Sequence, residues 1–100
     1  MYTKFIANGE DLTDVFYWEP SDDVVRGNYG IPTTMSLYPF ADKAKRVDEK
    51  FRQWGIFVIE YYGSAGRAGY RVQFLRSVLD CKHKNGKEVA FVELKVLARA

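Results

Sequence analysis

The sequence predicts an α+β fold: a small antiparallel β-sheet or OB-like barrel of about five to six strands, packed on one α-helix at about residues 41–54. Two Asn-Gly pairs, at 8–9 and 85–86, lie between segments that alternate in polarity, a pattern typical of two-residue hairpin turns. One segment alone carries a clear helical period. With 100 residues, of which 47% are hydrophobic, we expect one domain that spans residues 1–100.

The first half of the chain reads mainly as strands. Residues 2–7 alternate and predict a strand that ends at the first Asn-Gly turn. A second strand is expected at about 12–18, stopped by the proline that follows. A single helical turn over 21–25 and a glycine-rich loop lead to a third strand at 33–38.

The helix is predicted from apolar residues at every third or fourth position, which form one stripe that must pack on the sheet. The stripe consists of Phe40, Ala44, Val47, Phe51 and Trp54. Its opposite face carries mixed charges, typical of a solvated surface. Gly55 is placed to end the helix.

The second half predicts three more strands, at 56–62, 70–83 and 87–99, with a flexible link over 63–69. The resulting order, three strands, a helix and three strands, is that of an OB-type barrel. A sheet curled around one helix fits the same order. In the last hairpin, alternation predicts a core face made of Val92, Leu94 and Val96 against Leu75 and Leu79.

Cysteine and histidine usage limits the chemistry. Cys81 is the sole cysteine and His83 the sole histidine, so neither an internal disulfide nor a Cys/His zinc site is expected. A lone thiol fits a reducing, cytoplasmic compartment. The glycine-rich stretch 63–69 precedes a strand rather than a helix, which argues against a phosphate cradle. We expect no metal and no cofactor, and, without a long apolar stretch, no signal peptide or membrane span.

Charge is distributed unevenly along the chain. Residues 1–42 carry two cations and seven carboxylates, whereas residues 43–100 carry thirteen cations and six carboxylates. This asymmetry favours nucleic acid or an acidic protein surface as the partner of the second half, and it allows head-to-tail self-association into a homo-oligomer. The alternative is that the fold brings the two halves together and they neutralise each other.

The preferred hypothesis is a small non-enzymatic protein that binds single-stranded nucleic acid. Aromatic residues interleaved with arginines are typical of single-strand binders, because bases stack on rings and phosphates pair with cations. The predicted nucleic-acid-binding residues are Tyr61, Tyr62, Arg67, Tyr70, Arg71, Lys82, Lys84 and Lys87. In the opposing interpretation half of these tyrosines belong to the core.

A protein-interaction module is the first alternative. The chain is rich in Trp, Tyr, Phe and Arg, the residues that dominate interface hot spots, and hairpin edges can extend a partner's sheet. An assembly subunit or a small, virus-borne inhibitor of a larger complex would have these features.

A nuclease is the second alternative. Asp80, followed on the next strand by Glu93 and Lys95, resembles the metal-dependent nuclease core of Holliday-junction resolvases and many restriction enzymes. The resemblance implies that the two carboxylates hold Mg²⁺ and that the lysine positions the attacking water. A two-residue turn would pair Asp80 with Phe91 and place all three side chains on one face. The residues after Asp80 read Cys-Lys-His-Lys, which is typical of an edge and not of the buried strand of that family.

Overall fold

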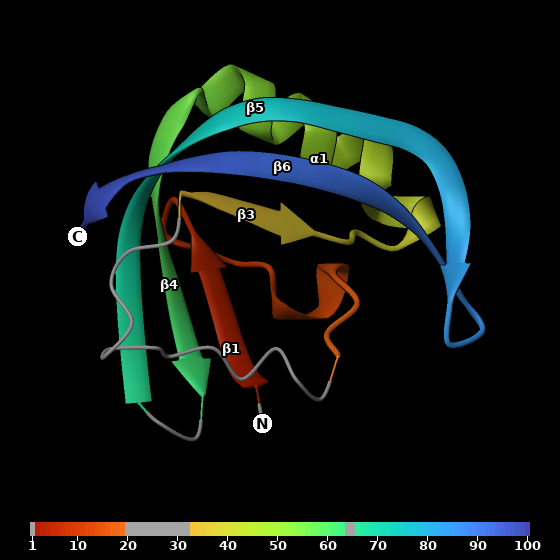
Figure 1. The fold of residues 1–100 in the computed structure, drawn as a ribbon, viewed down its shortest axis with the longest axis horizontal. Helices are drawn as coiled ribbons and strands as arrows, with labels where there is room; N and C mark the ends of the chain where they lie inside the picture. The colour runs from red at the N-terminus through yellow and green to blue at the C-terminus, as the bar shows by residue number, and fades with distance from the viewer. Residues whose placement is uncertain (1, 20–32, 64–65) are drawn as a thin grey trace.

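A computed structural model describes residues 2–19, 33–63 and 66–100 (Figure 1). These residues form one six-stranded antiparallel sheet in the order β2-β1-β4-β5-β6-β3, with one helix packed against it. The elements are β1 (Tyr2–Ala7), β2 (Glu10–Asp11), the 3-10 helix η1 (Thr13–Val15), β3 (Thr34–Leu37), α1 (Ala41–Trp54), β4 (Ile56–Gly63), β5 (Gly66–Lys84) and β6 (Lys87–Arg99). The α+β prediction is confirmed, and the sheet is open rather than a closed barrel. The helical turn and loop predicted between residues 21 and 32 lie outside the described residues.

Both Asn-Gly pairs form the predicted hairpin turns. Asn8 and Gly9 have φ angles of 53° and 80°, and Asn85 and Gly86 have 49° and 76°. Two successive positive φ values are the geometry that Asn-Gly adopts most readily, and the resulting twist matches that of the flanking strands. The turns therefore join β1 to β2 and β5 to β6.

The strand predicted at 12–18 is wrong. Asp11 accepts hydrogen bonds from the backbone N–H (3.0 Å) and the hydroxyl (2.6 Å) of Thr13, and these local bonds turn the chain into η1. The Thr13 hydroxyl in turn accepts the N–H of Phe5 at 2.9 Å, which a neighbouring strand would have bound. Among the described residues 12–19, Phe16 forms an isolated bridge to Pro39, flanked by the hydrogen bonds of Tyr17 to Tyr38 and of Phe40 to Val15.

The helix begins and ends at the predicted residues. Ala44, Val47 and Phe51 are buried, as the apolar stripe requires. Gly55 ends the helix with a φ of +69°, and its N–H binds the carbonyl oxygen of Phe51. No helix within the described ranges is long and apolar enough to cross a membrane.

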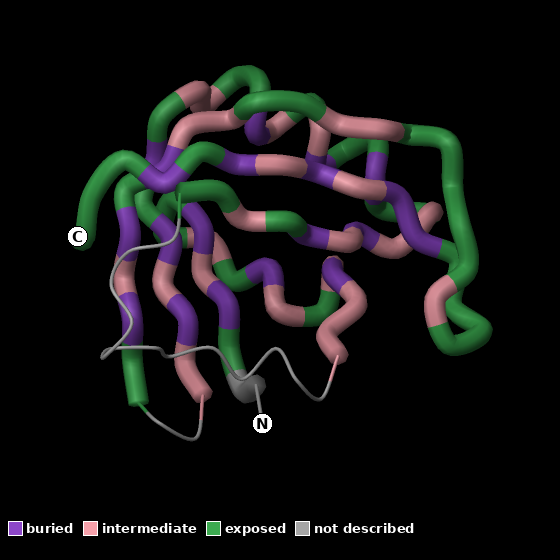
Figure 2. Tube along the Cα trace, viewed as in Figure 1, coloured by how far each residue is buried: buried purple, intermediate pink, exposed green. Residues whose placement is uncertain are grey.

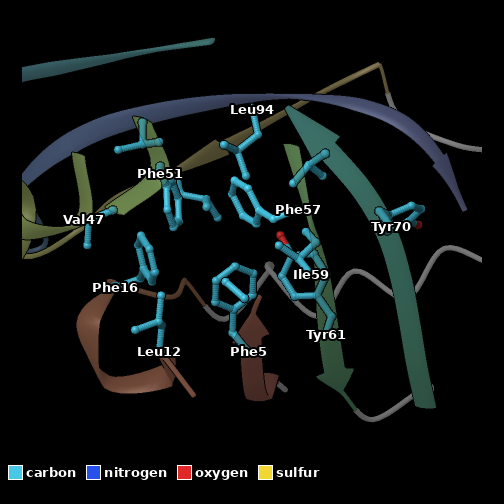
Figure 3. Packing of buried hydrophobic residues seen from close by; sticks show 14 of the residues in the cluster. Phe5, Leu12, Phe16, Val47, Phe51, Phe57, Ile59, Tyr61, Tyr70 and Leu94 are labelled. Atoms are coloured by element: carbon cyan, nitrogen blue, oxygen red, sulfur yellow. The ribbon is translucent and has the colours of Figure 1, made fainter. Parts of the chain in front are cut away.

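The core lies between α1 and the face of the sheet that α1 covers (Figure 3). It is rich in aromatic rings: Phe5 meets Phe16 edge to face at 5.4 Å between centroids, and Phe51 lies 4.9 Å from Phe57. Rings from β1, α1 and β4 and from the segment after η1 meet there, which fixes the helix against the sheet.

The predicted flexible link is largely strand. β4 continues to Gly63 and β5 starts at Gly66, with Gly63 and Gly66 paired, so the connection is much tighter than the predicted link over 63–69. β5 therefore runs over nineteen residues and arches across the sheet together with β6 (Figure 1).

The core face of the last hairpin is partly as predicted. Val92, Leu94 and Val96 are buried, but Leu75 and Leu79 are exposed. The register between β5 and β6 shifts between residues 74 and 76 and again between 78 and 82. Each extra residue in a strand interrupts the alternation of faces, so the two leucines leave the face that a regular strand would give them.

Candidate nucleic-acid interface

The face of the sheet opposite α1 is called the outer face here. Residues that pair directly across strands point to the same side of a sheet. Arg67 pairs with Tyr62, and Arg71 pairs with Val58. Arg76 pairs with Glu93. The register thus places all three arginines on the outer face.

The lysines at the tip of the β5–β6 hairpin lie on the same side of the strands as these arginines. Lys82 pairs with Val89, and Lys84 with Lys87. On β6, Lys87, Val89 and Phe91 alternate onto one side, and Phe91 pairs with Val78 next to the arginines. The five predicted cations, Arg67, Arg71, Lys82, Lys84 and Lys87, therefore share one side of the β5–β6 pair. Figure 2 shows how exposed the end of this hairpin is.

Two of the three tyrosines predicted to stack on bases are buried and not exposed. Tyr61 and Tyr70 retain 9% and 3% of their exposure and belong to the core, so neither ring is available to a base. They alternate with the outer-face residues of β4 and β5 and belong to the buried cluster, where the ring of Tyr61 lies next to that of Phe5 (Figure 3). Tyr62 is half-buried on the outer face, with the ammonium of Lys4 at 5.9 Å from its ring centroid.

Arg67 is already engaged by a carboxylate. Its guanidinium donates to Glu60 at 2.6 Å, and the hydroxyl of Tyr62 donates to the same carboxyl group at 3.2 Å. The hydrogen bond from Arg67, more than any other contact, holds the pKa of Glu60 below its ordinary value. Part of the charge at this end of the face is thus neutralised.

A hollow of about 480 Å³ lies at the other end, inside the bend of the β5–β6 hairpin. We call it the basic hollow; its lining residues are Tyr38, Arg76, Val78, Asp80, Lys82, His83, Lys84, Val89, Ala90 and Phe91. Two of the predicted lysines, Lys82 and Lys84, belong to it. The other predicted residues lie outside it.

Cations and aromatic rings meet in the basic hollow. The rings of Tyr38 and Phe91 lie 5.9 Å apart. The guanidinium of Arg76 lies 5.0 Å from the Phe91 centroid, and the ammonium of Lys84 lies 4.2 Å from that of Tyr38, both within cation–π range. Rings and cations are thus held together before any ligand arrives.

Several donors in the basic hollow remain available. Arg76 uses Nε for its 3.2 Å bond to Glu93, and no other bond of its guanidinium to a described residue is found. Lys82 and His83 are exposed and form no ion pair with any residue of the described ranges. Lys84 is paired with Glu19 at 2.7 Å.

Sequence reasoning missed Tyr38, Arg76 and Phe91. Phe91 stands in the outward-facing set of β6 with Glu93 and Lys95, so an unusual aromatic on the polar side was the signal that could have found it. Tyr38 gives no such signal, because it reaches the hollow through the pairing of β3 with β6.

The two halves of the chain neutralise each other in part. Five ion pairs are formed within the described residues, and two of them join the acidic first half to the basic second half: Glu10 to Lys50 and Glu19 to Lys84. Among the predicted binding cations, only Lys84 forms an ion pair with a described residue of the first half. The asymmetry is reduced but not removed.

The register predicted for the nuclease-like residues is wrong. Val78, not Asp80, pairs with Phe91, because the register shift before Lys82 inserts extra residues into β5. The carboxylate of Glu93 accepts a bond from Arg76. Across the part of the chain that the structure describes, no group of three Cys, His, Asp or Glu side chains could hold a metal ion.

No protein-family model, curated protein or solved structure gives a significant match to this chain. Two features of the chain itself therefore bear on its function. One is the row of cations on the outer face, and the other is the basic hollow at its end.

Proposed function

We propose that this protein binds single-stranded nucleic acid along the outer face of β5 and β6. The observation that carries the proposal is the register, which places seven cations on one side of two neighbouring strands. They are Arg67, Arg71, Arg76, Lys82, Lys84, Lys87 and Lys95. Within the described ranges, four carboxylates contact them or line the hollow, namely Glu19, Glu60, Asp80 and Glu93, so the cations outnumber the carboxylates among these residues.

The surroundings of these cations suit unpaired bases. The half-buried ring of Tyr62 and the exposed side chains of Ile56 and Val58 lie on the same face as Arg71. Bases of a single strand can lie against rings, apolar side chains and guanidinium planes while the phosphates pair with lysines and arginines. In a duplex the bases are stacked away from such contacts.

The proposal is tested by fluorescence anisotropy with a labelled fifteen-nucleotide single strand at several salt concentrations. We expect affinity to fall with salt, with a log–log slope of about 0.7 for each phosphate contacted. Arg71→Ala removes an exposed cation in the middle of the face and should weaken binding several-fold at low salt while lowering the slope by about 0.7.

Lys45→Ala is the matched control, because Lys45 is an exposed cation on α1, away from the outer face. It should leave both affinity and slope unchanged. Absence of binding by the unmutated protein at low salt would refute the proposal, as would equal losses in the two variants.

A protein partner on the same face is the second candidate. β4 is apolar on both sides, as in strands that are covered on both faces, yet Ile56 is 56% exposed and Val58 39%. Light scattering at low and high salt checks for self-association: a mass that rises with concentration and returns to that of a monomer in Val58→Thr would favour this candidate. A salt-dependent oligonucleotide complex of a monomeric protein would favour nucleic acid.

A further inference from the structure

We propose that the basic hollow is a pocket for a single nucleotide, whose phosphate binds at the cationic rim and whose base lies against Phe91 and Tyr38. The proposal rests on the proposed function, because it names the part of a bound strand that the hollow would hold. It also makes a separate claim, since a free mononucleotide should bind there.

The size of the hollow fits such a ligand. Its volume of about 480 Å³ lies within the range of roughly 300–1,000 Å³ that is usual for pockets of small molecules. One base with its sugar and phosphate is of this order of size, whereas a base pair with its two backbones is about twice as large. The volume of the hollow therefore suits an unpaired nucleotide better than a base pair.

The inner wall is apolar and firmly held. Val89 and Ala90 are buried, and the N–H of Ala90 donates to the carbonyl oxygen of Pro39 at 2.9 Å. The rings of Phe91 and Tyr38 stand next to this wall and contact each other. Such a surface favours a flat, largely apolar group and offers little to a fully hydrated anion.

The rim supplies the charge. Arg76 retains its terminal amino groups for a ligand, because Glu93 accepts only from Nε, and Lys82 has no ion pair with a described residue. A guanidinium and an ammonium on one rim can donate charge-assisted hydrogen bonds to the same phosphate. Asp80 is the one carboxylate among the described lining residues; it would repel additional negative charge and could accept hydrogen bonds from sugar hydroxyls or base amino groups.

Isothermal titration calorimetry tests the pocket, with adenosine and thymidine 5′-monophosphates as ligands and with adenosine, thymidine and inorganic phosphate as partial ligands. At least one mononucleotide should bind, and the corresponding nucleoside and phosphate should each bind at least about tenfold more weakly. Amide chemical shifts should change at Val78, Lys82 and Phe91.

Two variants separate the hollow from the rest of the outer face. Lys82→Ala should lower the mononucleotide affinity about tenfold, because it removes one charged donor. Lys95→Ala removes an exposed cation on the same face outside the hollow and should leave mononucleotide affinity unchanged. It should still weaken binding of the fifteen-nucleotide strand.

The outcomes distinguish the two proposals. If the long strand binds but neither mononucleotide does, or if the two variants lose mononucleotide affinity equally, the nucleotide pocket is refuted and the proposed function stands. If a mononucleotide binds in the hollow but the fifteen-nucleotide strand binds no more tightly than the mononucleotide, the pocket stands and single-strand binding along the face is refuted. If none of the ligands binds, both proposals fall.

Discussion

Glu60 determines how much positive charge the outer face presents near the connection between β4 and β5. It lies between Tyr62 and Arg67 and accepts hydrogen bonds from both. Its pKa is lowered from an ordinary value of 4.5, chiefly by the hydrogen bond from Arg67, and the pKa of Arg67 is raised by the same bond. A phosphate that binds Arg67 must compete with this carboxylate.

Arg67→Ala should raise the pKa of Glu60 toward its ordinary value. Because the pKa of Glu60 is lower in the folded protein than in the unfolded chain, the ion pair stabilises the fold above the unfolded pKa, and this contribution is lost as the pH falls through the folded pKa. Carboxyl NMR titration of both proteins measures the shift. An unchanged Glu60 pKa in the variant would contradict the assigned cause.

The tyrosines mark the limit of what the sequence could predict about the site. Tyr61 and Tyr62 are neighbours, but one is in the core and the other on the outer face. Alternation could not tell which was which, since β4 begins Ile-Phe-Val-Ile and is apolar on both sides. The cations could be predicted better, because charged residues on paired strands avoid the covered face.

Elements whose ends are set by local chemistry were predicted most accurately. The helical period and Gly55 define α1, and the Asn-Gly turn defines the start of β6. The prediction of a strand at 12–18 was wrong because the Asp11 carboxylate accepts hydrogen bonds from Thr13, two residues later. A pattern of apolar residues carries no information about such a side-chain contact.

Gly55→Ala tests the end of the helix. No atom lies within 4 Å of the position a Cβ would take, so steric contact adds nothing and the effect comes from the positive φ of 69°. We expect a loss of about 1 to 3 kcal/mol in the free energy of unfolding, because a residue with a Cβ rarely adopts the backbone angles of Gly55. Urea denaturation measures it, with Gln53→Ala on the exposed side of α1 as the control, which should change stability by less than about 0.5 kcal/mol.

At the scale of the whole molecule, the bend of the long hairpin brings distant segments together. The side-chain amide of Asn85 donates to the hydroxyl of Tyr17 at 2.8 Å, and Lys84 pairs with Glu19. The hairpin tip, which carries the Lys84 side of the basic hollow, is thus tied to the segment after η1. The sequence could not predict this, because the register shifts that bend β5 carry no local signature.

Tyr17→Phe should loosen the tip without unfolding the protein. The change removes the acceptor for Asn85 and keeps the ring, so amide hydrogen exchange should speed up at Lys82–Glu88 while the core of β6 stays protected. Tyr62→Phe removes a hydroxyl bond at the other end of the outer face and serves as the control. Equal exchange at the tip in both variants would show that the Asn85–Tyr17 bond does not hold it.

The order of the strands in the sheet also determines when the sheet can form. β1 pairs with β4, and β3 pairs with β6. Phe5 therefore cannot pair until Tyr61 has been synthesised, and Thr34 cannot pair until Lys95 has been synthesised. While the chain is being synthesised, each of these early segments lacks its neighbour until the matching late segment has been made. The sheet is therefore expected to form late and in one cooperative step, on the timescale of milliseconds to seconds that is usual for sheets with non-local pairing. A chain that stops before residue 92 would leave β3 without its partner strand β6.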